Sequence, residues 1–356
     1  MNAKLKNILL VALRWLLGGV FLFSGLVKCV DPIGNSIFVD KYLVTYGLGS
    51  LVQLSLPIAI ALSTIEVVVG ILLIIGLFSK RITITTTLLL SLFTIITLLS
   101  ATLLPIGDCG CFGEAVKLTP WQTFAKNILL LLLAIVLLRH TEYKPYVWRR
   151  VAVVVVAIIA LPIAINLYSL RYLPLVDFMP YKVGVDLRSV VHEERNTDGV
   201  LSILIFKNTT TGVVVEYSAD DMSCWENEAL EYVDARTEVV DNEAGSFADF
   251  ILYNRDGEDV TLDVLDMSGR VAWLCVNDVE KLTGRCKGYI ELLQSIYPKH
   301  AIVVLVASDS AYVAKVLNSE VYTIDAMTLR SIVRADIGVV VVNNGVVEFK
   351  SDIRDI

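Results

Sequence analysis

Histidine is scarce in this sequence, and the glycine-rich loops that hold phosphates are missing. The three histidines, His140, His192 and His300, stand isolated along the chain, so the sequence indicates neither a histidine-based metal site nor a haem. It contains no Walker-type or GxGxxG loop, which leaves no sequence basis for nucleotide binding. A Ser–His–Asp hydrolase has no local support either.

Charged residues are few in the first half of the chain and mostly acidic in the second half. The 356 residues are 55% hydrophobic, with a mean hydropathy of +0.67, which is too apolar for an ordinary soluble domain. Residues 1–170 hold 13 Lys and Arg against 6 Asp and Glu, and residues 171–356 hold 17 against 31. An acidic second half would be repelled by phosphates, so no nucleic acid partner is expected. The contrast predicts two parts with a boundary near Leu170.

Long apolar runs dominate the first half. Five of them approach or exceed the roughly 20 residues that cross a bilayer. They are expected at residues 8–27, 51–78, 82–104, 121–138 and 151–170. The first run is too long for the core of a signal peptide, and no small-residue cleavage site closes it, so it is predicted to remain as a helix. The lipid bilayer is therefore an expected partner.

The basic residues predict a single orientation in the membrane. Lys4, Lys6 and the loops 79–81 and 139–150 carry the densest positive charge, and positively charged loops remain in the cytoplasm. The other segments then lie outside: residues 28–50, 105–120 and 171–356. In a bacterium this describes a multi-pass inner-membrane protein with a cytoplasmic N-terminus and a periplasmic C-terminal domain.

Two cysteines, one glycine apart, stand in an outer loop. Cys109 and Cys111 face the compartment where disulfides persist. Gly110 allows the sharp bend that a disulfide between them needs, and the strain of so small a ring would make the bond reversible. Cys29, at the outer end of the first run, is either a small packing residue or the partner of one of these cysteines in a structural bond.

Ionisable residues interrupt the first two apolar runs. Glu66 lies near the middle of its run, where a carboxylate is costly and usually faces a partner or a polar cavity. It is expected to face the interior of the bundle, toward the first span. Arg14 is the seventh residue of its run, and it either reaches the cytoplasmic surface or joins a polar site. Lys126, near the outer end of the fourth run, is expected to reach the outer surface.

Three stretches carry a resemblance to a known family. They are RWLLGGVFLFSGLVKCVDP (14–32), IEVVVGILLIIGLFSKR (65–81) and GDCGCFGEAVKLTPWQTFAKN (107–127). The first four spans resemble the DoxX/MauE-like four-helix membrane proteins, and the Cys-Gly-Cys-Phe-Gly string is the most specific part. With its fifth span and outer domain, the whole chain resembles a DoxX-type group typical of Bacteroidetes.

This resemblance implies sulfur redox chemistry. MauE is a helper in the maturation of methylamine dehydrogenase, whose small subunit is rich in disulfides, and it acts with a separate thioredoxin-like partner. DoxX relatives include a membrane subunit linked to thiosulfate oxidation and quinone. The expected organisation is a four-helix membrane domain over residues 1–145, a fifth helix and linker over 146–180, and an outer domain over 181–356.

The outer domain is predicted to begin with a β-rich part and to continue with alternating strands and helices. Residues 201–206 and 212–217 form one expected hairpin, and residues 248–263 a second one that turns at Asp256-Gly257. Later strands are expected at residues 271–276, 301–307, 321–325 and, as a final hairpin, 338–350. This order resembles the thioredoxin fold. The predicted fold class is a membrane helical bundle followed by a soluble α/β thioredoxin-like domain with a β-rich insertion.

The outer domain departs from thioredoxins at the active position. Residues 307–312 (ASDSAY) stand where the helix with the Cys-x-x-Cys motif would open, and Ile337 stands where a cis-proline is expected. The domain is therefore predicted to bind or position a partner without thiol chemistry of its own. Cys275 is expected in the core, and no fixed pairing is expected among it, Cys224 and Cys286.

Two functional hypotheses remain open. In the first, the protein is a membrane thiol–disulfide component that passes electrons between a periplasmic thiol or disulfide protein and a carrier in the membrane, with quinone as the candidate. Cys109 and Cys111 would exchange electrons, and Glu66 and Arg14 would line the path inward. In the second, the protein is a non-enzymatic anchor or assembly factor with a static disulfide and a binding-only outer domain. No metal is expected in either case.

Overall fold

The structure is a computed structural model of the chain, and it divides into two compact units. These are Met1–Met179 and Pro180–Ile356. The described residues are 3–103, 110–113, 115–116, 118–143, 148–196, 200–208, 214–218, 230–239, 250–282, 284–298, 301–317 and 319–356.

Among these residues, five helices of the first unit are long and apolar enough to cross a bilayer. They are α1 (Ala3–Val30), α3 (Ser55–Ile75), α4 (Ser79–Thr102), α5 (Pro120–His140) and α6 (Trp148–Arg171). Each coincides with one of the expected apolar runs, so the prediction of five spans is confirmed. Gly76 ends α3 in the left-handed conformation, with φ 79°, and Thr119 and Gln122 form a capping box at the start of α5.

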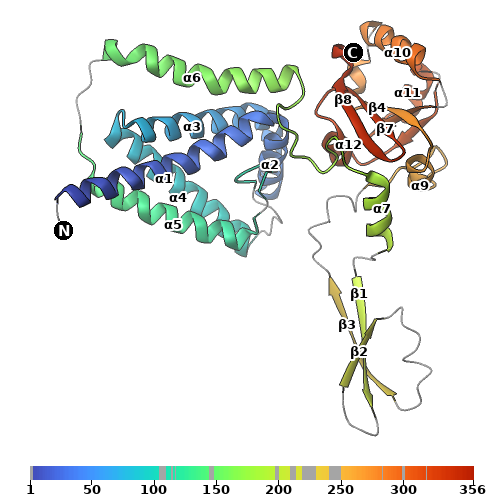
Figure 1. Ribbon diagram of the computed structural model, residues 1–356, viewed down its shortest axis with the longest axis horizontal. Helices are drawn as coiled ribbons and strands as arrows, with labels where there is room; N and C mark the ends of the chain where they lie inside the picture. The colour runs from blue at the N-terminus through green and yellow to red at the C-terminus, as the bar shows by residue number, and fades with distance from the viewer. Residues whose placement is uncertain are drawn as a thin grey trace. The chain divides into compact units, whose positions relative to one another are not determined.

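Small residues let α1 and α3 pack closely along each other (Figure 1). A Cβ atom on Gly70 would lie 2.6 Å from the backbone nitrogen of Leu22, and one on Gly25 would lie 2.7 Å from that of Val67. Backbones at this separation leave no room for a side chain, as is common where helices cross in membranes. The close crossing fixes which residues of the two helices face each other.

Replacing Gly70 by alanine is expected to destabilise the bundle by about 1–3 kcal/mol, because the added methyl group overpacks the crossing of α1 and α3. Gly19→Ala is the matched control, since Gly19 lies on α1 and nothing lies within 4 Å of its added Cβ. Thermal unfolding of both purified variants in one detergent measures the difference. Equal melting temperatures would contradict the close crossing.

The predicted outer loop 28–50 is largely helical, so the loop prediction was wrong. It contains α2 (Pro32–Thr45) and a short 3-10 helix, η1 (Gly49–Leu54). The Asp31 side chain accepts a hydrogen bond from the Gly34 backbone N–H at 2.8 Å, and a proline occupies the first turn. Both features favour the start of a helix. The segment is short and mixes polar with apolar residues, which hides a helical period.

A buried polar contact attaches α6 to the bundle. The side-chain amide of Asn166 donates to the Pro162 carbonyl at 2.8 Å, and it lies 3.2 Å from the Cys29 sulfur and 3.4 Å from the Ser63 hydroxyl. Asn166, Cys29 and Ser63 are fully buried. Because an unpaired polar group is costly in apolar surroundings, this contact fixes how α6 faces α1 and α3.

The second unit is built on a mixed five-stranded sheet. Its strands are β4 (Arg270–Val276), β5 (Ile302–Val306), β6 (Val321–Thr323), β7 (Ile337–Asn343) and β8 (Val346–Asp352). The order is β6-β5-β4-β7-β8, in which β4, β5 and β6 are parallel while β7 runs antiparallel to β4 and to β8. This arrangement is consistent with the predicted thioredoxin-like domain, and the final hairpin forms as predicted.

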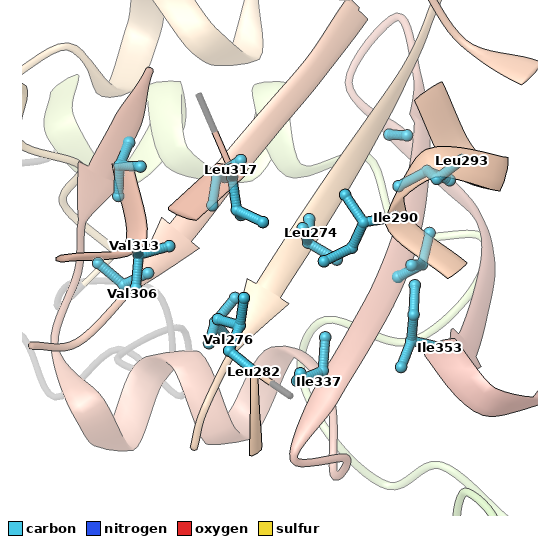
Figure 2. Close-up of a cluster of buried hydrophobic side chains, with 14 of the residues drawn as sticks. Leu274, Val276, Leu282, Ile290, Leu293, Val306, Val313, Leu317, Ile337 and Ile353 are labelled. Carbon is cyan, nitrogen blue, oxygen red and sulfur yellow. The ribbon is translucent and has the colours of Figure 1, made fainter. Parts of the chain in front are cut away.

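Helices accompany this sheet, and two of them, α10 (Gly284–Ile296) and α11 (Ser310–Leu317), contribute side chains to its main core. The other helices are α7 (Leu187–Asn196), α9 (Thr261–Leu265) and α12 (Ala326–Ile332). Alternate residues of β4, such as Leu274 and Val276, join Ile290 of α10 in one buried apolar cluster (Figure 2). The intervening Trp273 points to the other face, where it stacks on Phe250 with ring centres 5.9 Å apart. The two faces of β4 are thus both buried, as its continuous apolar sequence predicts.

A three-stranded antiparallel sheet belongs to the β-rich part. It consists of β1 (Val200–Asn208), β2 (Val214–Ser218) and β3 (Leu230–Val239), in the order β2-β1-β3. The pairing of β1 with β2 confirms the first predicted hairpin.

The second predicted hairpin, over residues 248–263, forms only around its predicted turn at Asp256-Gly257, and its second strand does not extend to residue 263. In the described part of this segment, Tyr253 and Asp259 form a single bridge around the turn of residues 254–257, and the chain then enters α9. The Asp259 carboxylate accepts a hydrogen bond from the Thr261 backbone N–H at 2.9 Å. This local bond turns the chain into a helix where a second strand was expected.

The predicted position of a thioredoxin-type active helix was also wrong. Residues 307–312 follow β5, whereas β4 is the central strand. The chain that leaves β4 begins with Asn277 and Asp278 and reaches α10 at Gly284, and Cys286 lies in the first turn of that helix. This stretch carries no Cys-x-x-Cys motif.

Candidate functional site

A cavity of about 310 Å³ lies within the membrane unit. Helices α1 to α5 line it, together with residues 110–112 of the cysteine loop. Its charged and polar lining residues are Ser24, Lys28, Asn35, Glu66, Thr97, Lys126 and Asn127, and its aromatic ones are Phe21, Phe38, Tyr42, Tyr46, Phe93 and Phe112. The cavity therefore combines a large apolar wall with a small set of charged groups, which is typical of ligand-binding pockets.

Glu66 forms a buried ion pair at this cavity. Its Oε1 atom lies 2.7 Å from the Lys28 Nζ, and the two side chains are 1% and 7% exposed. Glu66 faces α1, as predicted. Neither charge reaches water, so each depends on the other to offset the cost of desolvation.

The Ser24 hydroxyl joins Glu66 to the cysteine loop. Its oxygen lies 2.7 Å from Oε2 of Glu66 and 2.6 Å from the backbone carbonyl oxygen of Cys111. A hydroxyl has one proton to donate, so it cannot donate to both oxygens at once. Ser24 therefore donates to one oxygen at a time, and it lies between the Glu66 carboxylate and the Cys111 carbonyl. The geometry therefore links the Glu66 carboxylate to the position of the loop.

Two asparagines and a second lysine complete the polar wall. Asn35 donates to a backbone carbonyl of α3 at 3.2 Å, and Asn127 donates to the Thr97 hydroxyl at 3.4 Å. Lys126 was predicted to reach the outer surface, but it lines the cavity. Its Nζ lies 4.1 Å from the centre of the Phe112 ring, a cation–π contact that holds the ammonium inward.

The cysteine loop reaches the cavity through Gly110 and Cys111. Gly110 has a φ of +60°, and a Cβ atom there would overlap the ring of Phe38 on α2. Both facts require glycine at this position. Cys109, the other half of the predicted redox pair, lies outside the described residues.

Arg14 lies at a different level of the bundle. Its guanidinium donates to the Ile74 carbonyl at 3.4 Å and packs against Gly76, at the C-terminal end of α3. Glu66 precedes Ile74 by eight residues, which is about 12 Å along a helix. A cation is favourable at a helix C-terminus because of the helix dipole. Arg14 does not belong to the cavity lining that the structure describes.

Cys29 is a packing residue. It is fully buried and a free thiol, and its sulfur lies 3.2 Å from the amide nitrogen of Asn166. This position agrees with the packing interpretation and contradicts a bond to Cys111. The alternative bond, between Cys29 and Cys109, stays a prediction because Cys109 lies outside the described residues.

Ser24 and Lys28 were not predicted as site residues. They stand four residues apart in SGLVK, so they lie on one face of a helix. The predicted first span ended at Val27, which left Lys28 in the outer loop, whereas α1 continues to Val30. The sequence signal that could have identified them is this spacing, which places two polar residues on the same face of a mostly apolar helix.

The comparison with known families agrees with the membrane part of the chain. Residues 6–140 match the family described as methylamine utilisation protein MauE. The match confirms the predicted DoxX/MauE resemblance for this region, and every residue that lines the cavity lies within it. No curated protein and no solved structure matches the chain.

Proposed function

From the MauE-type membrane region that this chain carries, we propose a membrane thiol–disulfide component that supports the maturation of proteins outside the cytoplasm. The observation that carries the proposal is the place of Cys111. Cys111 borders the cavity that Glu66 and Lys28 also line, and Ser24 contacts both Glu66 and the Cys111 carbonyl. Perturbed or paired ionisable groups beside a reactive side chain in a cavity are typical of functional sites.

The proposed step balances in electrons and protons. Oxidation of the Cys109 and Cys111 thiols to a disulfide releases two electrons and two protons. Quinone is the candidate carrier, because it takes up two of each within a membrane. The disulfide would then be passed to a partner by exchange, in which one S–S bond breaks as another forms. Glu66, joined to the loop by Ser24, is the residue of this chain proposed to hold a proton.

The cavity suits a flat ring with carbonyl oxygens. Aromatic side chains form much of its wall, and Lys126 and Asn127 offer N–H donors at its polar end. Its volume of about 310 Å³ lies at the lower end of the range for small-molecule pockets. The support for quinone as the carrier is thus the match of its size and polar groups to the cavity.

The proposal includes an orientation. The basic loops favour a cytoplasmic N-terminus with the cysteine loop and the second unit outside. The second unit would then bind or position the partner, since the stretch from β4 to α10 has no Cys-x-x-Cys motif.

Labelling of the cysteines in intact cells tests this proposal. We expect a membrane-impermeant maleimide to label the Cys109–Cys111 pair only after reduction. We also expect Cys109→Ser to trap Cys111 in a mixed disulfide with a partner, which gel electrophoresis detects as a band that reductant removes. Cys29→Ala is the matched control and should leave both results unchanged. Thiols that are free in growing cells and insensitive to oxidant would refute the redox role, and labelling only after permeabilisation would refute the orientation.

The alternative is a non-enzymatic anchor or assembly factor with a static disulfide. The tight contact between Gly110 and the Phe38 ring favours it, because a rigid loop suits a structural role. Redox titration separates the two functions: a structural disulfide has a potential below about −300 mV, whereas an exchanging pair titrates near those of known oxidoreductases.

A further inference from the structure

Within the described part of the chain, the polar end of the cavity carries more positive than negative charge. Among the described residues that line it, Lys28 and Lys126 are cationic and Glu66 is acidic. The summed charge of these three side chains is therefore positive, because two ammonium groups face one carboxylate. Positive charge inside a membrane bundle is costly unless an anion compensates it.

Among the described residues, the two lysine ammonium groups at this end carry more N–H groups than the acceptors that they meet. The Lys28 ammonium has three N–H groups, and within the described structure it meets one acceptor, Oε1 of Glu66. Lys126 meets the Phe112 ring and has no oxygen acceptor in the part of the chain that is described. A ligand that fits here must supply oxygen acceptors, and a negative charge strengthens such bonds.

The rest of the cavity suits a hydrocarbon chain. The rings of Phe38 and Tyr42 on α2, and of Tyr46 directly after it, line one side of the cavity. Ile58 of α3 lines the cavity and is 38% exposed, so the apolar wall includes a side chain that the bundle leaves partly uncovered. A volume of about 310 Å³ admits a small head group and the start of one chain.

We propose that this cavity binds a single-chain lipophilic carboxylate, such as a free fatty acid. The carboxylate would lie between Lys28 and Lys126, where it compensates the positive charge and accepts hydrogen bonds from their N–H groups. Its chain would follow the rings of α2 toward the lipid. A two-chain phospholipid is too large for the cavity. The inference goes beyond the proposed function, since it does not depend on the chemistry of Cys109 and Cys111. The carboxylate and the quinone candidate would compete for this one cavity.

Photolabelling of the purified full-length protein tests the inference. The probe is a C16 fatty acid that carries a diazirine on its chain, and peptide mass spectrometry locates the label. We expect the label on α2 and α3, and we expect palmitate to compete at least about tenfold better than methyl palmitate, because the ester lacks the charge. Equal competition by acid and ester would overturn the proposal.

Lysine variants give a second, independent readout. Lys126→Gln should weaken palmitate competition by about tenfold, while Lys126→Arg, which keeps the charge, should retain most of it. Lys80→Gln is the matched control, because Lys80 donates to the Leu138 carbonyl and does not line the cavity. Equal competition in Lys126→Gln and Lys80→Gln would overturn the proposed head-group position, as would a label confined to α6.

Discussion

Replacing Lys28 by methionine is expected to lower the free energy of unfolding of the membrane unit by about 3–5 kcal/mol. The variant leaves the Glu66 carboxylate, 1% exposed, without the ammonium that lies 2.7 Å away. Glu66→Leu should cost about as much, because it leaves the Lys28 ammonium buried and unpaired. Unfolding of the purified protein in detergent, followed by the loss of helical signal, measures both losses.

The double variant Lys28→Met/Glu66→Leu is the decisive control. It removes both charges and replaces them by apolar side chains, a change that is often neutral or stabilising for buried ion pairs. We therefore expect its stability to return close to that of the wild type. A double variant that loses the sum of the two single losses would show that Lys28 and Glu66 are not coupled.

Cys275 is expected to react with iodoacetamide about 10³-fold more slowly in the folded protein than in denaturant at pH 8. It is fully buried on β4, as predicted from the sequence, and burial raises the pKa of its thiol to about 12. The reactive thiolate is therefore scarce at pH 8, whereas an ordinary thiol is partly ionised there. Mass spectrometry of the peptide that contains Cys275 measures both rates.

The same pKa shift fixes the sign of a pH dependence. The folded state keeps the Cys275 proton up to a pH of about 12, while the unfolded state loses it near pH 9. Between pH 9 and 12 the unfolded state binds fewer protons, so the free energy of unfolding falls as the pH rises through this window. Below pH 9 the contribution of Cys275 to stability is fully present. Cys275→Ala should remove this part of the pH dependence. Similar alkylation rates in folded and denatured protein would contradict the burial of Cys275.

Long, strongly patterned elements were predictable from the sequence. The five membrane spans are apolar over about 20 residues, and β4 is apolar on both faces, so hydrophobicity alone identifies them. The final hairpin has a turn signal at Asn344-Gly345, where both residues have positive φ. In these places one local property decides the structure.

Short elements were not predictable, because weak local bonds decide them. The start of α2 depends on one hydrogen bond to Asp31, and the start of α9 follows a bond from Thr261 to Asp259. The sequence also does not show that β4, the first strand of the five-stranded sheet, occupies its centre. That position depends on pairing with β5 on one side and β7 on the other.

The site was predictable in part. The depth of Glu66 in an apolar run indicated that it needs a partner, but the partner could not be named. Lys28 meets Glu66 because α1 extends past the predicted end and because glycines let α1 and α3 approach closely. Lys126 turns inward because Phe112, in another segment, offers its ring. Such contacts depend on tertiary packing.

The order of the cavity-lining residues along the chain has a consequence for biosynthesis. The last of them is Leu130, on α5. During synthesis, every wall of the cavity is therefore present in the nascent chain before α6 and the second unit are made. The MauE match, over residues 6–140, also contains all of the described lining residues and ends before α6 and the second unit.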